Sequence, residues 1–404
     1  MLGRVVVVGA SLAGLRAVEA LRHQDYAGEI VWLGAEAHTP YDRPPLSKQL
    51  LRGEWPAERV GLRRDKGCDE QSVDLRLGVS ATALDTANKR LILGDGSTLD
   101  YDGIVIATGA SARHLPFGHG LSGVHVLRTL DDALAIRAAL PARPRVCVVG
   151  AGFIGLEVAA SCRGLGLQVC AVEPFPLPLA NKLGERMARL IADLHIARGV
   201  DLRCGTSVVG LHGDGRVEAV QLSDGSTVQA DLVVVGVGVQ PSIQWLEGSG
   251  LALGDGVLCD ATCAASAPDV VAAGDVARWH NPLFGESMRV EHWSNAGEMA
   301  THAVKRLLGG PDFIEPFKPV PYFWSDQYDL KIQFAGSVRP DDQIAIVEGT
   351  EQDRKLVALY GREGRVTGVI AFNRPAQLVR YRRLLADGMS WEAGLAQAQA
   401  QPKP

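Results

Sequence analysis

The chain has 404 residues, with 41 Lys and Arg against 46 Asp and Glu, so its formal net charge is −5. Hydrophobic residues make up 47% and charged residues 22%, which excludes disorder, collagen and coiled coil as descriptions of the whole chain. The length predicts about two to three domains, and the slightly acidic balance argues against a nucleic-acid-binding protein, which usually has a basic surface.

The first predicted unit is a strand, a glycine turn, a helix and a second strand. Residues 4–14 read R-V-V-V-V-G-A-S-L-A-G, and we expect the helix over 15–24 and the next strand over 30–33. This order predicts a parallel sheet with a right-handed crossover. The turn, Gly9-x-Ser11-x-x-Gly14, has Ser11 in place of the middle glycine of a dinucleotide motif, and Glu36 is the acid expected at the ribose. Ala13 excludes the G-x-S-x-G elbow of a hydrolase.

The same pattern returns at residues 145–155, which read R-V-C-V-V-G-A-G-F-I-G. Here the motif is complete, Gly150-x-Gly152-x-x-Gly155, and we expect a helix over 156–164 and a strand over 169–172. Glu173 ends that strand and is placed to accept hydrogen bonds from a ribose 2′-hydroxyl. No Arg follows it over 174–179 to hold a 2′-phosphate, so the sequence predicts NADH rather than NADPH. Two dinucleotides in one chain imply electron transfer between them.

Two more strands are expected over 104–108 and 232–239, and the segment 120–128 carries the chain from the first half into the second. After residue 315, prolines and aromatic residues precede strand-like alternations at 331–335, 344–348, 356–360 and 365–372. A helix over 376–387 would close this part, which predicts a separate antiparallel α+β domain. We expect the tail, 397–404, to be frayed.

The cysteines suggest a reducing compartment. There are 7, none in a C-x-x-C pair, and the spacing of Cys259 and Cys263 offers no metal site. Residues 1–4 lead straight into a strand without a signal sequence, and no apolar stretch reaches the length of a membrane helix. We therefore expect a cytoplasmic protein with no metal and no membrane association.

Eight stretches, in order, carry a family resemblance. They are P-Y-D-R-P-P-L-S-K at 40–48, V-I-A-T-G-A at 105–110, L-R-T-L-D-D-A at 127–133, V-V-G-A-G-F-I-G-L-E at 148–157, G-V-G-V-Q-P at 236–241, A-A-G-D-V-A at 272–277, V-E-H-W-S-N-A at 290–296 and Y-F-W-S-D-Q-Y at 322–328. Over essentially its whole length the chain resembles the bacterial FAD-dependent NADH:ferredoxin reductases of oxygenase systems, including the putidaredoxin-reductase and rubredoxin-reductase types.

The resemblance implies an α/β fold with two Rossmann-like dinucleotide-binding domains, as in glutathione reductase, and a C-terminal α+β domain. The implied division is a discontinuous FAD-binding domain of residues 1–111 and 239–316, an NAD-binding domain of 112–238 and a C-terminal domain of 317–404.

It also implies the cofactor contacts. Arg43 and Lys48 would lie against the flavin, Arg128 would reach the FAD phosphates and Asp275 would bind the ribityl hydroxyls. A helix starting near Ser294 would point its positive end at the flavin. The full FAD set is Gly9, Ser11, Leu12, Ala13, Gly14, Glu36, Arg43, Pro45, Lys48, Val79, Ala107, Thr108, Gly109, Arg128, Gly274, Asp275, Glu291, His292, Trp293 and Ala296. The NAD set is Gly150, Gly152, Phe153, Ile154, Gly155, Glu157, Glu173, Val237 and Gly238.

The function implied is transfer of electrons from NADH through FAD to a [2Fe–2S] ferredoxin that feeds an oxygenase or a cytochrome P450, with Lys48 and Glu157 as the catalytic pair. The segment 41–50 has no cysteine, so the electrons would pass to an outside acceptor rather than to a protein dithiol. Rubredoxin reductase, NADH oxidase and a non-catalytic flavoprotein resembling apoptosis-inducing factors are the alternatives.

We expect the ferredoxin to bind at basic residues. The expected positions are Arg380, Arg382 and Arg383 in the last predicted helix, together with Arg63, Arg64 and Lys66. We expect the protein itself to be a monomer or a weak homodimer.

Overall fold

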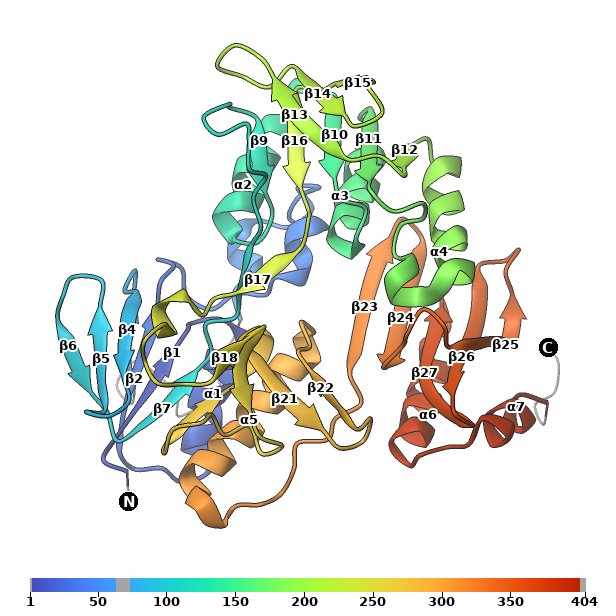
Figure 1. The fold of residues 1–404 in the computed structure, drawn as a ribbon. Helices are drawn as coiled ribbons and strands as arrows, with labels where there is room; N and C mark the ends of the chain where they lie inside the picture. The colour runs from blue at the N-terminus through green and yellow to red at the C-terminus, as the bar shows by residue number, and fades with distance from the viewer. Residues whose placement is uncertain (1, 63–72, 400–404) are drawn as a thin grey trace. The chain divides into compact units, whose positions relative to one another are not determined.

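A computed structural model describes residues 2–62 and 73–399 (Figure 1). Its contacts divide the chain into two compact units. The first contains Met1–Asp42, Gly61–Ser111 and Gln240–Tyr322, and the second contains Arg43–Val60, Ala112–Val239 and Phe323–Pro404. Arg63, Arg64 and Lys66 lie outside the described residues. The division into three domains stays a prediction.

The first unit is built on a parallel five-stranded sheet with the order β20-β7-β1-β2-β3. Its strands are β1 (Arg4–Val8), β2 (Glu29–Gly34), β3 (Asp74–Leu77), β7 (Gly103–Ile106) and β20 (Val270–Ala272). Helices α1 (Leu12–His23) and α5 (Trp293–Gly309) pack with it in one apolar core. Because the strands are parallel, the loops that follow β1, β2, β7 and β20 meet at one edge of the sheet.

Two smaller sheets also lie in the first unit. One is the antiparallel meander β4 (Ala81–Asp85), β5 (Arg90–Leu93) and β6 (Thr98–Asp100). The other contains β18 (Leu253–Gly254), β19 (Gly256–Cys259), β21 (Ala277–Asn281) and β22 (Glu286–Met288).

The second unit repeats the parallel design with the order β12-β11-β10-β16-β9. Its strands are β9 (Val124–Val126), β10 (Val146–Val149), β11 (Val169–Glu173), β12 (Asp201–Cys204) and β16 (Leu232–Val235). Helices α2 (Leu130–Ala139) and α3 (Phe153–Gly164) follow β9 and β10, and a small sheet is formed by β13 (Val208–His212), β14 (Ala219–Leu222) and β15 (Thr227–Gln229).

The C-terminal sheet of the second unit has the order β23-β24-β27-β26-β25. The strands are β23 (Tyr322–Gln327), β24 (Leu330–Gly336), β25 (Gln343–Thr350), β26 (Lys355–Arg362) and β27 (Arg365–Phe372), followed by helices α6 (Pro375–Ala386) and α7 (Trp391–Gln399). This sheet shares a core with α3 and with α4 (Ala180–Ala197), in which Leu156, Met187 and Ile332 are fully buried. Burial of each such side chain contributes about 1.5–3 kcal/mol.

Several element boundaries differ from those expected. Both helices after the glycine turns begin three residues before the predicted positions, at Leu12 and Phe153. The single strand expected over 232–239 is wrong: β16 ends at Val235, Gly238 has φ +93°, and β17 (Val239–Pro241) is a separate strand. The strand expected over 104–108 ends at Ile106. Residues 397–399 belong to α7, which the sequence did not predict.

A bidentate ion pair joins the starts of two central strands in the second unit. Arg145 donates from Nε and Nη2 to the two carboxylate oxygens of Asp231, at 2.9 and 2.7 Å. The hydrogen bonds from Arg145 lower the pKa of Asp231 to about 2 from its ordinary value of 3.8. The pair therefore stabilises the fold above the unfolded pKa, and this contribution is lost as the pH falls through the folded pKa.

We expect Asp231→Asn to lower the free energy of unfolding at pH 7. The difference from wild type should shrink as the pH falls below about 4, because the wild-type carboxylate then becomes protonated on unfolding. Urea unfolding of both proteins at a series of pH values would measure it. A difference that stays constant from pH 7 to pH 3 would show that the ion pair does not contribute in this way.

Two candidate dinucleotide sites

The first site lies at the carboxyl edge of the first sheet, where the turn after β1 is shaped by close backbone contacts. Gly9 has φ +119°, and a Cβ built there would lie 2.1 Å from the Ala107 carbonyl oxygen. A Cβ on Gly14 would lie 1.8 Å from the Gly9 carbonyl oxygen. Only glycine therefore lets α1 start directly against the turn. This contact explains why the helix includes the third glycine of the motif and begins earlier than predicted.

Small residues bring three distant segments together at this edge. A Cβ built on Gly274, which follows β20, would lie 3.1 Å from the Cβ of Ala13 and 3.7 Å from that of Ala296. Ala13 belongs to the first turn of α1 and Ala296 to the first turn of α5. The amino ends of both helices are thus close to the loop that holds Asp275.

Helices α1 and α3, which follow the two glycine motifs, begin without side-chain caps, and so does α5. The residues before α1, α3 and α5 make no capping hydrogen bond, and none of the three helices has an acidic residue in its first turn. By contrast, α2 has a complete capping box between Thr129 and Asp132. The first amides of an uncapped helix can bind the oxygens of a phosphate or another electron-rich group. The residues present therefore fit the pyrophosphate groups of two dinucleotides.

Other predicted FAD residues are also located in the first unit. Glu36 accepts a 2.5 Å hydrogen bond from the Tyr41 hydroxyl, and Val79 follows β3, bonded to the Gly34 carbonyl. Thr108 donates to the Ser242 carbonyl at 2.9 Å.

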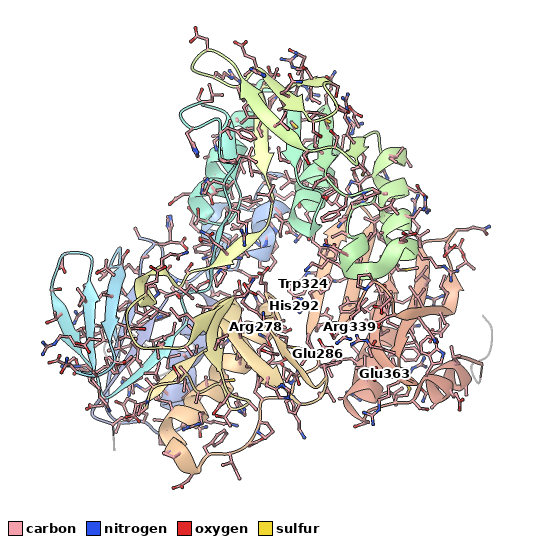
Figure 2. All side chains as sticks on the ribbon, in the orientation of Figure 1. Arg278, Glu286, His292, Trp324, Arg339 and Glu363 are labelled. Carbon is pink, nitrogen blue, oxygen red and sulfur yellow. The ribbon has the colours of Figure 1, made fainter. Side chains whose placement is uncertain are left out.

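The predicted residues at the start of α5 are held by neighbouring side chains. Trp293 donates to Asp42 at 2.6 Å, and Glu291 pairs with Arg289 at 2.6 Å. His292 directly precedes α5 (Figure 2).

Four members of the predicted FAD set belong to the second unit: Arg43, Pro45, Lys48 and Arg128. Arg43 donates from Nη1 to the Arg128 carbonyl, and Pro45 lies in a 3-10 turn, Pro44–Ser47, that ends at Lys48. Contact of these four residues with FAD stays a prediction.

The second site is formed at the carboxyl edge of the second sheet, and the whole predicted NAD set lies in this unit. A Cβ on Gly155 would lie 2.0 Å from the Gly150 carbonyl oxygen, whereas one on Gly152 would meet no atom within 4 Å. The open space beside Gly152 is where the motif requires a pyrophosphate to approach. Ile154, in the first turn of α3, and Val237, in the loop after β16, have exposed apolar side chains.

Glu173 already has backbone partners. One carboxylate oxygen accepts from the Ala151 N–H at 2.8 Å and the other from the Phe175 N–H at 3.2 Å. The side chain is thereby fixed beside the glycine turn, and each oxygen retains a further lone pair for a ribose hydroxyl. Its role at the ribose stays a prediction.

Lys48 and Glu157 form a buried ion pair in the second unit. The Lys48 ammonium lies 2.8 Å from Glu157 Oε2, and both side chains are at most 5% exposed. Ser47 donates to the same oxygen at 2.5 Å, and Ser325 donates to Oε1 at 2.7 Å. Neither serine is among the predicted site residues, although each lies in a stretch that carries the resemblance.

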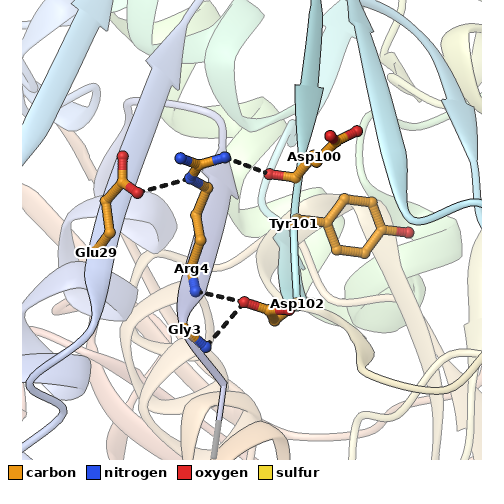
Figure 3. A pocket seen from close by; sticks show the side chains of 6 residues that line it. All are labelled: Gly3, Arg4, Glu29, Asp100, Tyr101 and Asp102. Atoms are coloured by element: carbon orange, nitrogen blue, oxygen red, sulfur yellow. Dashed lines mark hydrogen bonds and ion pairs between the residues drawn. The ribbon is translucent and has the colours of Figure 1, made fainter.

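A polar pocket lies at the opposite edge of the first sheet (Figure 3). Arg4 and Glu29, which begin β1 and β2, form an ion pair at 2.7 Å. The Asp102 carboxylate accepts hydrogen bonds from the backbone N–H groups of Gly3 and Arg4. Because dinucleotides bind at the carboxyl ends of parallel strands, this pocket at the amino ends is separate from the predicted cofactor site.

Two parallel sheets, each with a glycine turn that leads into an uncapped helix, are typical of dinucleotide-dependent oxidoreductases. Residues 3–300 match the model of the pyridine nucleotide-disulphide oxidoreductases, and residues 322–402 match a reductase C-terminal domain. The chain belongs to the pyridine nucleotide-disulphide oxidoreductase family, which uses FAD and NAD(P)H.

Similar proteins place it more closely within that family. It is 36% identical to a ferredoxin–NAD(P)(+) reductase of Sphingomonas sp., covering 98% of this chain and 95% of that one. It is also 36% identical to the ferredoxin–NAD(+) reductase component of an anthranilate 1,2-dioxygenase system of Burkholderia cepacia, over 95% and 94% of the two chains. Its fold matches a covalent putidaredoxin reductase–putidaredoxin complex with a TM-score of 0.91 at 32% identity, covering 99% of each chain. The predicted fold class and family are confirmed.

We expect the two glycines of the second turn to respond differently to alanine. Gly155→Ala should lower the free energy of unfolding, because its Cβ would meet the Gly150 carbonyl. Gly152→Ala should leave stability unchanged but weaken NADH binding by about tenfold or more, because its methyl group occupies the space required by the pyrophosphate. Thermal unfolding and NADH titration of both variants would test this. Unchanged NADH affinity in Gly152→Ala would contradict the assignment.

Proposed function

We propose that the protein transfers electrons from NADH through FAD to a [2Fe–2S] ferredoxin that serves an oxygenase or a cytochrome P450. The observation that carries the proposal is the pair of open glycine-turn sites at the edges of two parallel sheets, in a chain similar throughout its length to ferredoxin reductases of oxygenase systems. FAD supplies an acceptor for the hydride of NADH and can release the electrons singly.

The chain's own residues supply binding and orientation. The first turns of α1 and α3 provide amides for the two pyrophosphates, and Glu173 receives the ribose of NADH. Lys48 and Glu157 act as the catalytic pair, because the buried carboxylate holds the Lys48 ammonium in a fixed position close to the start of α3. We propose that the nicotinamide of NADH binds close to the Lys48–Glu157 pair.

The predicted ferredoxin contacts on α6 differ in their exposure. Arg383 is exposed in α6, whereas Arg380 is half-buried, paired with Glu348 at 2.5 Å and stacked over Tyr381. Arg383 is therefore the strongest member of the proposed contact.

A reducing compartment, the cytoplasm, suits the thiols. Six cysteines among the described residues are free, and burial raises the pKa of Cys162 and of Cys259 to about 12. Within residues 2–62 and 73–399, no helix has the length and apolar character needed to span a membrane.

Steady-state turnover with separate acceptors tests the function. With NADH as donor, cytochrome c reduction should require a [2Fe–2S] ferredoxin, and the rate should fall as salt rises because opposite charges guide docking. Rubredoxin and oxygen serve as the comparison acceptors. Faster turnover with rubredoxin would favour a rubredoxin reductase, and rapid oxygen consumption without a carrier would favour an NADH oxidase.

The nicotinamide preference tests the role of Glu173. We expect kcat/KM to be higher for NADH than for NADPH by an order of magnitude or more, because a carboxylate and a 2′-phosphate about 4 Å apart repel by ~4 kcal/mol at an effective dielectric constant of about 20. Glu173→Gln should bring kcat/KM for NADPH closer to that for NADH, because the substitution removes the negative charge. A wild-type preference for NADPH would contradict the assignment.

A further inference from the structure

A chain of buried hydrogen bonds extends from Glu157 into the C-terminal sheet and onto α4. Ser325 Oγ lies 2.7 Å from Glu157 Oε1, Gln327 Nε2 lies 3.0 Å from Ser325 Oγ, and His195 Nε2 lies 2.9 Å from Gln327 Oε1. Ser325, Gln327 and His195 are all 0% exposed, and Glu157 is 2% exposed. All of these residues belong to the second unit.

The ionised end of the chain determines the direction of every hydrogen bond. The Glu157 carboxylate can only accept, so Ser325 uses its hydroxyl hydrogen toward Glu157 and its oxygen accepts from the Gln327 amide nitrogen. The Gln327 oxygen then faces His195, which must present a protonated Nε2. The remaining nitrogen, Nδ1, faces the Tyr328 hydroxyl at 3.4 Å.

His195 is consistent with a neutral ring of this form. Burial is the main cause that lowers the pKa of His195 below its ordinary value of 6.5. The outer end of the chain meets Tyr328, and the guanidinium of Arg198 lies 5.1 Å from the Tyr328 ring centre. Arg163 and Cys162 also act on Tyr328, and Arg198 pairs with Asp329 at 2.5 Å. A neutral His195 with hydrogen on Nε2 satisfies Gln327 without bringing a second positive charge toward Lys48.

The apolar surroundings make this arrangement costly to disturb. Leu156, Leu194 and Leu330 belong to the core that packs around α3, α4 and β24. Hydrogen bonds in such a low-dielectric region strengthen one another, and a buried polar group that loses its partner is strongly destabilised. The Glu157 carboxylate is therefore held from one side by Ser47 and Lys48 and from the other by Ser325.

We infer that Ser325, Gln327 and His195 are positioning residues, which orient the Glu157 carboxylate and thereby hold the Lys48 ammonium in place for hydride transfer. The catalytic part of this inference rests on the proposed function. None of the three residues needs to touch NADH or FAD to act in this way.

Variants at both ends of the chain test the inference in the FAD-loaded enzyme. Ser325→Ala should slow flavin reduction by NADH about tenfold to a hundredfold in stopped-flow experiments, the effect of losing a hydrogen bond to a charged group. His195→Phe removes a hydrogen bond to the neutral Gln327 amide and should slow it about threefold to tenfold. The dissociation constant of NADH should change far less. His195→Gln should recover most of the rate, because an amide nitrogen can replace the Nε2 donor. Ser249→Ala, at a buried serine of the first unit, is the matched control and should keep the wild-type rate.

A readout that does not depend on activity is the tautomer of His195 in wild-type protein. Nitrogen-15 NMR of labelled histidine should show a protonated Nε2 and an unprotonated Nδ1 at neutral pH. A hydrogen on Nδ1 alone would overturn the inference, as would wild-type rates of flavin reduction in both Ser325→Ala and His195→Phe.

The two proposals fail in different ways. If NADH does not reduce the wild-type flavoprotein, the proposed function and the catalytic part of this inference are both overturned, while the tautomer still decides the hydrogen-bond chain. If wild type is reduced but His195→Gln remains as slow as His195→Phe while both are folded, the donor role of His195 is overturned and the proposed function stands.

Discussion

The contact between the third and first glycines of each turn is the constraint on which both cofactor sites depend. In each unit a Cβ on the third glycine would lie at or below 2.0 Å from the carbonyl oxygen of the first. Such a distance is impossible for any other residue, so the helix can start directly above the end of the strand only because both positions are glycine. The uncapped helix starts and the open space beside Gly152 both depend on this close approach.

Much of the fold could be predicted because the signals are local. A β-branched run followed by a glycine turn identifies β1 and β10, and the strand predicted over 365–372 agrees with β27. The exact helix starts could not be predicted, because they depend on contacts between Gly155 and Gly150 that alternation does not reveal. The break between β16 and β17 depends on the left-handed backbone of Gly238, which an apolar run obscures.

The candidate sites were predictable to different degrees. Motif residues such as Gly152 and Glu173 are identified by spacing, and the pairing of Lys48 with Glu157 was expected from the resemblance. His195 carried no signal, because its partner Gln327 is 132 residues away and lies on another element. His195 is one of 10 histidines in the chain, and only the packing of α4 against the C-terminal sheet distinguishes it from the others.

The discontinuous division of the chain has a consequence for the order of events on the ribosome. The first parallel sheet begins at Arg4 but needs β20, which ends at Ala272, whereas the second is complete at Val235. The parallel sheet that is started later is therefore the first to have all its strands, and β7 of the earlier sheet has an open edge until β20 has been made. Because an unpaired strand edge favours incorrect pairing during synthesis, the open edge of β7 is the part of the first sheet at risk until Ala272 has been translated.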